Sequence, residues 1–235
     1  MFLLLVACTG REPQTDQGRP PLGGDDTAAD TGPAVPLDGQ GDVSGECGVI
    51  GHAEWTSGEP LLVRNAIDLG DGGLDVEDLS EGGTKVYEDG NLGGSSLLSE
   101  VLAYELLYRC ELAELIKTEA EIVYATEGKK TDLIADIDDR VVGVSVTRAF
   151  HYPPEDPYTP EEGTELLTDK LSDAAEAAGN ASAADAWGRT LLHVIAYDSQ
   201  YADEIEVAWA GLSASVTQDY FVVVTVTDGN DEEVY

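Results

Sequence analysis

The stretch TDLIADIDDRVVGVSVTR, from Thr131 to Arg148, decides the fold, because its pattern predicts two antiparallel strands joined by a tight turn. Successive strand residues point to opposite faces of a sheet, and a two-residue turn fixes which residues lie opposite each other. A turn at Asp138-Asp139 places Asp132 opposite Ser145.

The same register separates the two faces of the hairpin. The apolar face holds Leu133, Ala135, Val144 and Val146, and the polar face holds Asp132, Ser145 and Thr147.

Composition limits the classes of function. The chain has 235 residues and a formal net charge of −35, from 12 basic and 47 acidic side chains, and its hydrophobic content of 42% is sufficient for a core. Residues 1–46 contribute only 8 acids and 2 bases, so a net charge of −29 belongs to the segment that follows. Such a surface repels nucleic acid and anionic lipid headgroups. Solubility, or life in a salty medium, is the simpler explanation of the acidity.

The first residues predict a cellular address. MFLLLVAC (Met1–Cys8) resembles the lipobox of bacterial lipoproteins, although it lacks a positive n-region and its apolar part is short. The resemblance implies a lipid on Cys8 and a protein anchored to a membrane by that lipid, on the periplasmic face or the cell surface, with the outer membrane as the expected place. The alternative is a chance apolar start on a cytosolic protein. Residues 9–45 are rich in Gly, Pro, Asp and Thr and predict a flexible, disordered tether.

The remaining cysteines, Cys47 and Cys110, form an even pair. In an oxidising compartment they could form a disulfide, and two unpaired buried thiols are the alternative.

Periodicity divides the rest into a loop-rich lead-in, 46–95, and an α/β domain, 96–235. The lead-in predicts loops and one or two short strands, with short apolar pieces at 61–63 and 85–87. The domain contains helices from Ser96 to Leu115, at 161–178, 183–187 and 203–212, and strands at 121–126, 191–197 and 220–227 besides the hairpin. Within the lead-in, Asp68–Asp78 (DLGDGGLDVED) has oxygen ligands at spacings found in Ca²⁺ loops, but it lacks the complete loop pattern, which favours a solvated acidic loop.

The order helix, three strands, helix, strand resembles the core of the PD-(D/E)XK nuclease superfamily, over roughly residues 96–197. The resemblance implies an αβββαβ core with a mixed central sheet flanked by helices. In that family a Glu on the first helix, an Asp starting the second strand and Glu-x-Lys on the third surround Mg²⁺ ions. Asp132 matches the Asp, and Glu100 or Glu105 matches the helical Glu. Ser145-Val146-Thr147 stands where Glu-x-Lys is expected, so the resemblance supports the fold better than an activity.

Two residues could replace the missing groups. The hairpin register puts Lys130 and Asp136 on the face of Asp132, where they could serve as a displaced lysine and a second metal ligand. The competing interpretation is a fold kept for packing or binding. In that interpretation Glu105 pairs with Arg109, one helical turn later.

Three functions follow from these residues. The first is an uncharacterised, membrane-anchored bacterial lipoprotein whose inactive nuclease-like domain binds a protein or other ligand. The second is an active Mg²⁺-dependent nuclease or phosphodiesterase using Glu100 or Glu105, Asp132 and Lys130. The third is a Ca²⁺-bound structural module using the Asp68–Asp78 loop. The charge and the missing Glu-x-Lys favour the first.

Overall fold

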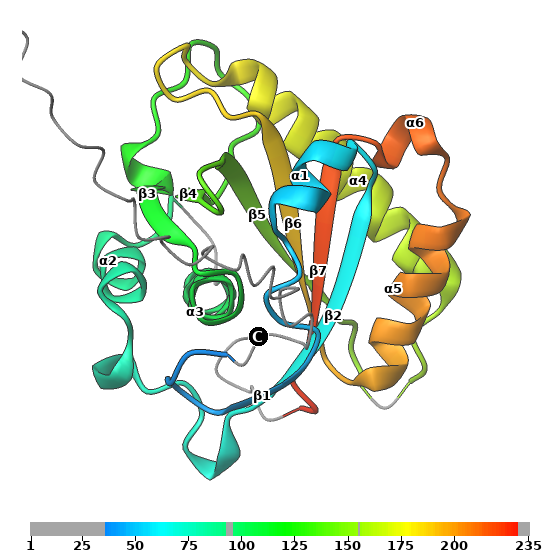
Figure 1. Ribbon diagram of the computed structural model, residues 1–235. Coiled ribbons are helices and arrows are strands. Elements are labelled where there is room, and N and C mark those ends of the chain that lie inside the picture. Colours follow the sequence, from blue (N-terminus) through cyan, green and yellow to red (C-terminus); the bar gives the residue numbers. More distant parts are fainter. Residues whose placement is uncertain (1–35, 93–95, 155, 230–235) are drawn as a thin grey trace, which may run out of the picture. The chain divides into compact units, whose positions relative to one another are not determined.

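The computed structural model describes residues 36–92, 96–154 and 156–229, which form a mixed α/β fold around one seven-stranded sheet (Figure 1). The strands lie in the order β1-β2-β7-β6-β5-β4-β3. Strands β2, β7, β6 and β5 are mutually parallel, and β1, β4 and β3 each run antiparallel to their neighbours. The bounds are β1 Asp42–Gly45, β2 Leu61–Asp68, β3 Glu114–Thr118, β4 Leu133–Asp136, β5 Val141–Ala149, β6 Arg189–Ala196 and β7 Tyr220–Val226.

Six α-helices accompany the sheet in the described part of the chain. They are α1 His52–Ser57, α2 Glu81–Asp89, α3 Leu97–Glu111, α4 Pro160–Asn180, α5 Ser199–Gly211 and α6 Ala214–Thr217. None of the helices described is long and apolar enough to cross a membrane.

The central hairpin has the predicted register. Leu133 pairs with Val144, and the hairpin closes through mutual backbone hydrogen bonds of 2.9 and 3.1 Å between Ile137 and Arg140. The turn residues Asp138 and Asp139 have φ of +55° and +60°, a left-handed pair that matches the twist of a two-residue hairpin. The prediction of this hairpin is confirmed.

Two cores lie on opposite faces of the sheet. Helix α3 packs on one face against residues such as Val144 and Leu191, together with Phe221 of β7. Helices α4 and α5 pack on the other face, where Leu192 and Val222 lie. Neighbouring residues of β6 thus enter different cores, which explains why this strand is a continuous apolar run.

Three predictions of secondary structure are wrong. The strand expected at 121–126 lies instead at β3, because Leu112 adopts a left-handed conformation that ends α3 before the apolar stripe does. Residues 119–121 form a 3₁₀ turn, and the helix expected at 183–187 is absent from these described residues. In each case the prediction rested on the local pattern of apolar residues, and this pattern does not show where the chain turns.

The lead-in is more structured than expected. Residues 61–68 form the eight-residue strand β2, which lies beside β7 inside the sheet, and Lys85–Tyr87 belong to helix α2, not to a strand. Part of the predicted tether, Asp42–Gly45, is strand β1. The lipobox and the tether up to residue 35 lie outside the described residues.

Three consecutive residues at the end of α3 hold the segment 37–50. Arg109 donates hydrogen bonds to the backbone carbonyls of residues 37, 40 and 41. Cys110 forms a disulfide with Cys47. The buried carboxylate of Glu111 accepts the backbone N–H groups of residues 48, 49 and 50, at 3.0, 3.3 and 2.8 Å. This α3 clamp fixes the chain where it enters the fold.

Candidate functional site

The Asp132 carboxylate lies at the start of β4, where the predicted site would be. Its backbone N–H donates to the Val144 carbonyl at 3.0 Å, and its Oδ2 accepts the backbone N–H of Val146 at 2.6 Å. The Ser145 side chain does not bond to Asp132; its hydroxyl lies 3.2 Å from the hydroxyl of Thr131. The carboxylate therefore bonds to the backbone of β5 and not to the side chain opposite it.

Glu100 reaches the same region from helix α3. Its side chain is 3% exposed, and its Oε1 accepts the Ser96 hydroxyl at 2.8 Å and the Asn91 amide at 3.2 Å. Burial raises the pKa of Glu100, while these two hydrogen bonds oppose the rise. The first turn of α3 thus holds a carboxyl group toward the sheet.

The charge of Glu100 acts on the Asp132 carboxyl group. Burial of its carboxyl group first, and the charge of Glu100 second, raise the pKa of Asp132 to about 8, although the residue as a whole is partly exposed. The Val146 N–H opposes the shift, the charge of Glu119 adds to it, and that of Lys170 opposes it. We call these groups the Glu100–Asp132 pair. Asp132 is therefore harder to ionise than an ordinary aspartate.

The other predicted helical acid, Glu105, lies elsewhere. Its Oε1 accepts the Ser80 hydroxyl at 2.6 Å and the Ser80 backbone N–H at 3.0 Å, at the N-terminus of α2. Burial raises the pKa of Glu105, and the charge of Arg109 only partly offsets this. Glu105 therefore joins two helices and is not close to Asp132, which leaves Glu100 as the helical acid of the candidate site.

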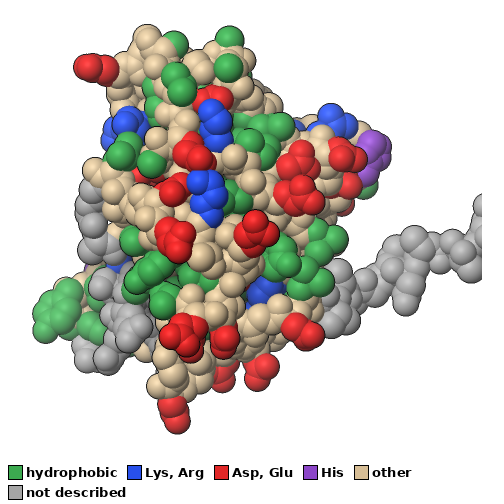
Figure 2. Space-filling model, turned by 90° about the vertical axis from the view of Figure 1, so that its left-hand side faces the viewer, with side chains coloured by type: hydrophobic (Ala, Val, Ile, Leu, Met, Phe, Trp, Pro, Cys, Tyr) green, Lys and Arg blue, Asp and Glu red, His purple; other side chains and the backbone are tan. Residues whose placement is uncertain are grey.

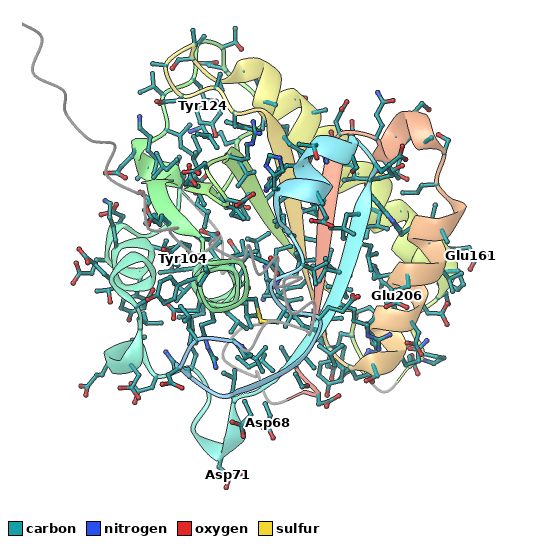
Figure 3. All side chains as sticks on the ribbon, viewed as in Figure 1. Asp68, Asp71, Tyr104, Tyr124, Glu161 and Glu206 are labelled. Atoms are coloured by element: carbon teal, nitrogen blue, oxygen red, sulfur yellow. A yellow bond between two sulfur atoms is a disulfide. The ribbon has the colours of Figure 1, made fainter. Side chains whose placement is uncertain are left out.

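Neither expected replacement, Lys130 or Asp136, forms a hydrogen bond or ion pair with the Asp132 side chain in the described part of the chain. The Lys130 ammonium is exposed and lies 5.6 Å from the centre of the Tyr124 ring (Tyr124 is labelled in Figure 3). Asp136 ends β4 opposite Val141, four residues and roughly 13 Å of strand from Asp132. The cation whose charge acts on Asp132 is Lys170 of α4. The sequence could not predict a role for Lys170, because this residue lies in α4, and strand β5 and a loop separate that helix from Asp132.

The two histidines of interest have local roles. His193 is fully buried in β6, and its Nε2 lies 2.8 Å from the hydroxyl of Thr225, which donates to Asn65 at 2.6 Å. Burial lowers the pKa of His193 to about 3, so the ring is neutral. His151 follows β5 and contacts Glu162 through Nδ1 at 2.9 Å. Neither histidine belongs to the Glu100–Asp132 pair.

The donor set does not fit a resident divalent ion. Within the described ranges no group of three or more His, Cys, Asp or Glu side chains is arranged to hold a metal. The Glu100–Asp132 pair supplies two carboxyl groups, and Ser145 and Thr147 stand at the positions where the nuclease resemblance implied Glu and Lys. We therefore derive no chemical step through a metal here.

The Asp68–Asp78 loop uses its carboxylates to fix its own backbone. Asp68 accepts the N–H of Gly70 at 2.8 Å, and Asp75 accepts the N–H of Glu77 at 2.9 Å. Asp68 ends β2, and Asp71 lies at the outer tip of the loop that follows it (Figure 3). Such contacts are common in turns and helix caps. They agree with the expectation of a solvated acidic loop.

The surface agrees with the composition. On the face that carries α2 and β3, carboxylate side chains are spread widely, with only a few Lys and Arg side chains between them (Figure 2). Lys85 lies there between Asp89 and Glu121, at 2.7 and 2.9 Å. Basic groups on this face are thus used to relieve repulsion between acids.

The comparisons with known proteins give one informative similarity. The chain is 35% identical over 152 residues to the AAC-rich mRNA clone AAC4 protein of Dictyostelium discoideum. The match covers 62% of this chain and 22% of the relative, so the chain spans about a fifth of the length of the curated relative that it matches. No family model matches the chain. No solved structure matches it significantly.

Proposed function

We propose that this chain is a lipid-anchored bacterial envelope protein whose nuclease-like domain binds a protein or another ligand and does not cleave nucleic acid. The observation that carries the proposal is the state of Asp132, the residue that corresponds to a metal-binding nuclease Asp. Its carboxyl group accepts the Val146 N–H at 2.6 Å, and burial followed by the Glu100 charge raises its pKa to about 8. A carboxyl group with a raised pKa must lose its proton before it can bind Mg²⁺, and this competition weakens Mg²⁺ binding at neutral pH.

The order of elements supports a nuclease-like core. Helix α3, the antiparallel strands β3, β4 and β5, helix α4 and the parallel strand β6 follow one another as αβββαβ, and α3 and α4 cover opposite faces of a mixed sheet. This is the order of the PD-(D/E)XK core. Strands β1 and β2, from the lead-in, then extend the same sheet beyond β7.

The charge of the domain supports binding without cleavage. A net charge of −29 beyond residue 46 opposes the approach of a phosphate backbone, whose affinity depends on Lys and Arg. A protein partner with a basic surface would instead be attracted.

The disulfide supports an oxidising location. Cys47–Cys110 lies inside the α3 clamp, and such bonds persist in periplasmic and extracellular proteins. With a lipid on Cys8, about thirty residues would separate the membrane anchor from the clamp, and a Gly- and Pro-rich segment of that length serves as a tether.

A second function, a metal-dependent nuclease with a rearranged site, is favoured by one observation. Glu100 from a helix, Asp132 from a strand and Lys170 from a second helix converge closely enough for their charges to act on the Asp132 carboxyl group. Two acids and a cation are the residue types that such an enzyme would need.

One assay separates the two functions. The purified chain is incubated with single- and double-stranded DNA and RNA, with Mg²⁺, with Mn²⁺ and with chelator, beside the variants Asp132→Ala and Asp136→Ala. We expect no metal-dependent cleavage by any of the three proteins. Cleavage that Asp132→Ala abolishes and Asp136→Ala leaves intact would establish the nuclease and end the binding proposal.

Two further measurements test the location and the Ca²⁺ hypothesis. Membrane fractionation of the wild type and of Cys8→Ser should place only the wild type in the membrane. Identical fractionation of both would contradict the lipid anchor. A large Ca²⁺-dependent rise in melting temperature would revive the Asp68–Asp78 loop as an ion site.

A further inference from the structure

A cavity of about 480 Å³ lies at the N-terminal ends of the parallel strands, away from the Glu100–Asp132 pair. The hairpin turn, the starts of β5 and β6, the residue before β7, and helix α1 line it. Figure 1 shows α1 lying beside the starts of β6 and β7. The volume falls within the range of small-molecule sites in proteins. We call this cavity the α1 pocket.

Two arginines line the α1 pocket in a chain that has only 12 basic residues. The Arg189 guanidinium lies over the ring of Phe221 at 4.5 Å, and its one hydrogen bond to the described residues is a long one of 3.4 Å to the carbonyl of Glu59. The Arg140 side chain has no hydrogen bond or ion pair within the described part of the chain. Most of the N–H donors of both guanidinium groups are thus available to a ligand.

A third donor in the α1 pocket is unpaired. The indole Nε1 of Trp55 is shielded from solvent and has no hydrogen-bond partner among the described residues. A buried N–H without an acceptor costs free energy that a bound acceptor would recover. The Trp55 ring is held by Phe221, with ring centres 4.7 Å apart, and Phe221 also carries the Arg189 guanidinium. One phenyl ring therefore positions two of the three donors before any ligand arrives.

The charge of the pocket sets the class of ligand. Asp139 and Asp219 also line it, and neither lies within ion-pair distance of the two guanidinium groups in the described structure. Two arginines and two aspartates make the pocket formally neutral, whereas the chain as a whole carries −35. The distant acids are screened over about 8 Å at physiological ionic strength, so the nearby donors decide binding.

We propose that the α1 pocket binds a small carboxylate, with the ligand oxygens accepting from Arg189, Arg140 and the Trp55 indole. Guanidinium groups match a carboxylate in a planar, two-bond geometry, and the indole N–H supplies a further donor. A carboxylate fits better than a phosphate, because two aspartates in the lining repel a doubly charged ligand more strongly than a singly charged group. This site does not depend on the proposed function of the Glu100–Asp132 pair.

Nuclear magnetic resonance of the indole N–H groups tests the proposal directly. The full chain is titrated with acetate, succinate and citrate, and separately with inorganic phosphate and putrescine, at constant ionic strength. The Trp55 indole signal is assigned by its absence in Trp55→Phe. We expect a saturable shift of that signal with at least one carboxylate, because its N–H gains an acceptor.

Two pocket variants and one control complete the test. Arg189→Gln and Arg140→Gln should each weaken carboxylate binding at least tenfold, and Arg140 is exposed on the hairpin turn, so its replacement leaves the core unchanged. Lys129→Gln removes the same charge from a surface pair with Asp173 and should leave affinity unchanged. No saturable shift with any carboxylate, equal affinity in both pocket variants, or a shift with phosphate or putrescine alone would overturn the proposal.

Discussion

Replacement of Asp132 by Asn should make the protein more stable at alkaline pH and leave it nearly unchanged in acid. The folded state holds the pKa of Asp132 at about 8, against 3.8 for the free group. Between these values the folded chain binds a proton that the unfolded chain releases, so the free energy of unfolding falls as the pH rises through this window. Asn resembles the protonated form and retains an oxygen for the Val146 N–H, which removes this dependence.

The structure sets the size of the effect. A shift of about 4 pH units at 1.36 kcal/mol each gives an upper bound of about 6 kcal/mol. Because Asp132 is partly exposed, solvent screening reduces this, and we expect Asp132→Asn to gain about 2–3 kcal/mol over the wild type between about pH 4 and 8.5.

Chemical denaturation at several pH values measures the difference. Asp136→Asn on the same strand is the control, because it removes the same charge from a position outside the Glu100–Asp132 pair. Repulsion among the many other acids changes with pH in both variants and cancels in the comparison. Parallel stability curves for the wild type and Asp132→Asn would refute the reasoning, and so would an equal gain from Asp136→Asn.

Four further outcomes follow from the structure. Glu100→Gln should lower the pKa of Asp132, measured by ¹³C resonance of its carboxyl carbon, because the Glu100 charge is the second cause of its rise. Glu111→Ala should lower the free energy of unfolding by about 3 kcal/mol in denaturation experiments, because it leaves three backbone N–H groups without their acceptor. Cys110→Ser should cost about 4 kcal/mol, the chain entropy of opening a loop of 63 residues. The pKa of the His151 ring, measured by ¹H resonance, should lie above its usual value, because Glu162 and a backbone carbonyl accept hydrogen bonds from its two nitrogens. The stability that this contact contributes is present at acid pH and is lost as the pH rises through the raised pKa.

Three of these outcomes have a control or a contradicting result. Glu114→Ala on the exposed edge strand should change stability little, which separates the Glu111 effect from a general loss of charge. Reducing agent should lower the stability of the wild type to that of Cys110→Ser and leave the variant unchanged. A His151 pKa at its ordinary value, or one that Glu162→Gln leaves unmoved, would contradict the pairing of its ring.

The hairpin could be predicted because its determinants are local. Two aspartates in left-handed conformations make the turn, and alternation of apolar residues fixes the register, so the sequence alone pairs Leu133 with Val144. The buried strands β6 and β7 and the long helix α4 were predictable for the same reason, since their patterns extend over many residues.

The end of α3 and strand β3 could not be predicted, because their determinants are tertiary. Leu112 continues the apolar stripe, yet it takes a left-handed conformation, and no Gly or Pro marks the stop. The irregular segment after β3 is held by Lys117 and Asp185, which lie 2.7 Å apart but 68 positions apart in the chain. A contact of that separation leaves no local signal.

The candidate site was predictable only in part. Asp132 follows from the hairpin, but the choice between Glu100 and Glu105 depends on which face of α3 meets the sheet, and α3 is apolar on nearly every side. Lys170 acts on Asp132 through the packing of α4, which the sequence does not specify. Within the α3 clamp, the Cys47–Cys110 disulfide was one of the two alternatives that the sequence left open. The Glu111 contacts were missed, because Glu111 binds backbone N–H groups, which carry no sequence signal.

The most direct test of the central claim is the titration of the Asp132 carboxyl carbon by ¹³C resonance, without and with millimolar Mg²⁺. We predict a midpoint near 8 that Mg²⁺ leaves unchanged, because the carboxyl group is a protonated partner of the Val146 N–H. A midpoint at the ordinary value for Asp would contradict the account, and a midpoint that falls when Mg²⁺ is added would identify Asp132 as a metal ligand.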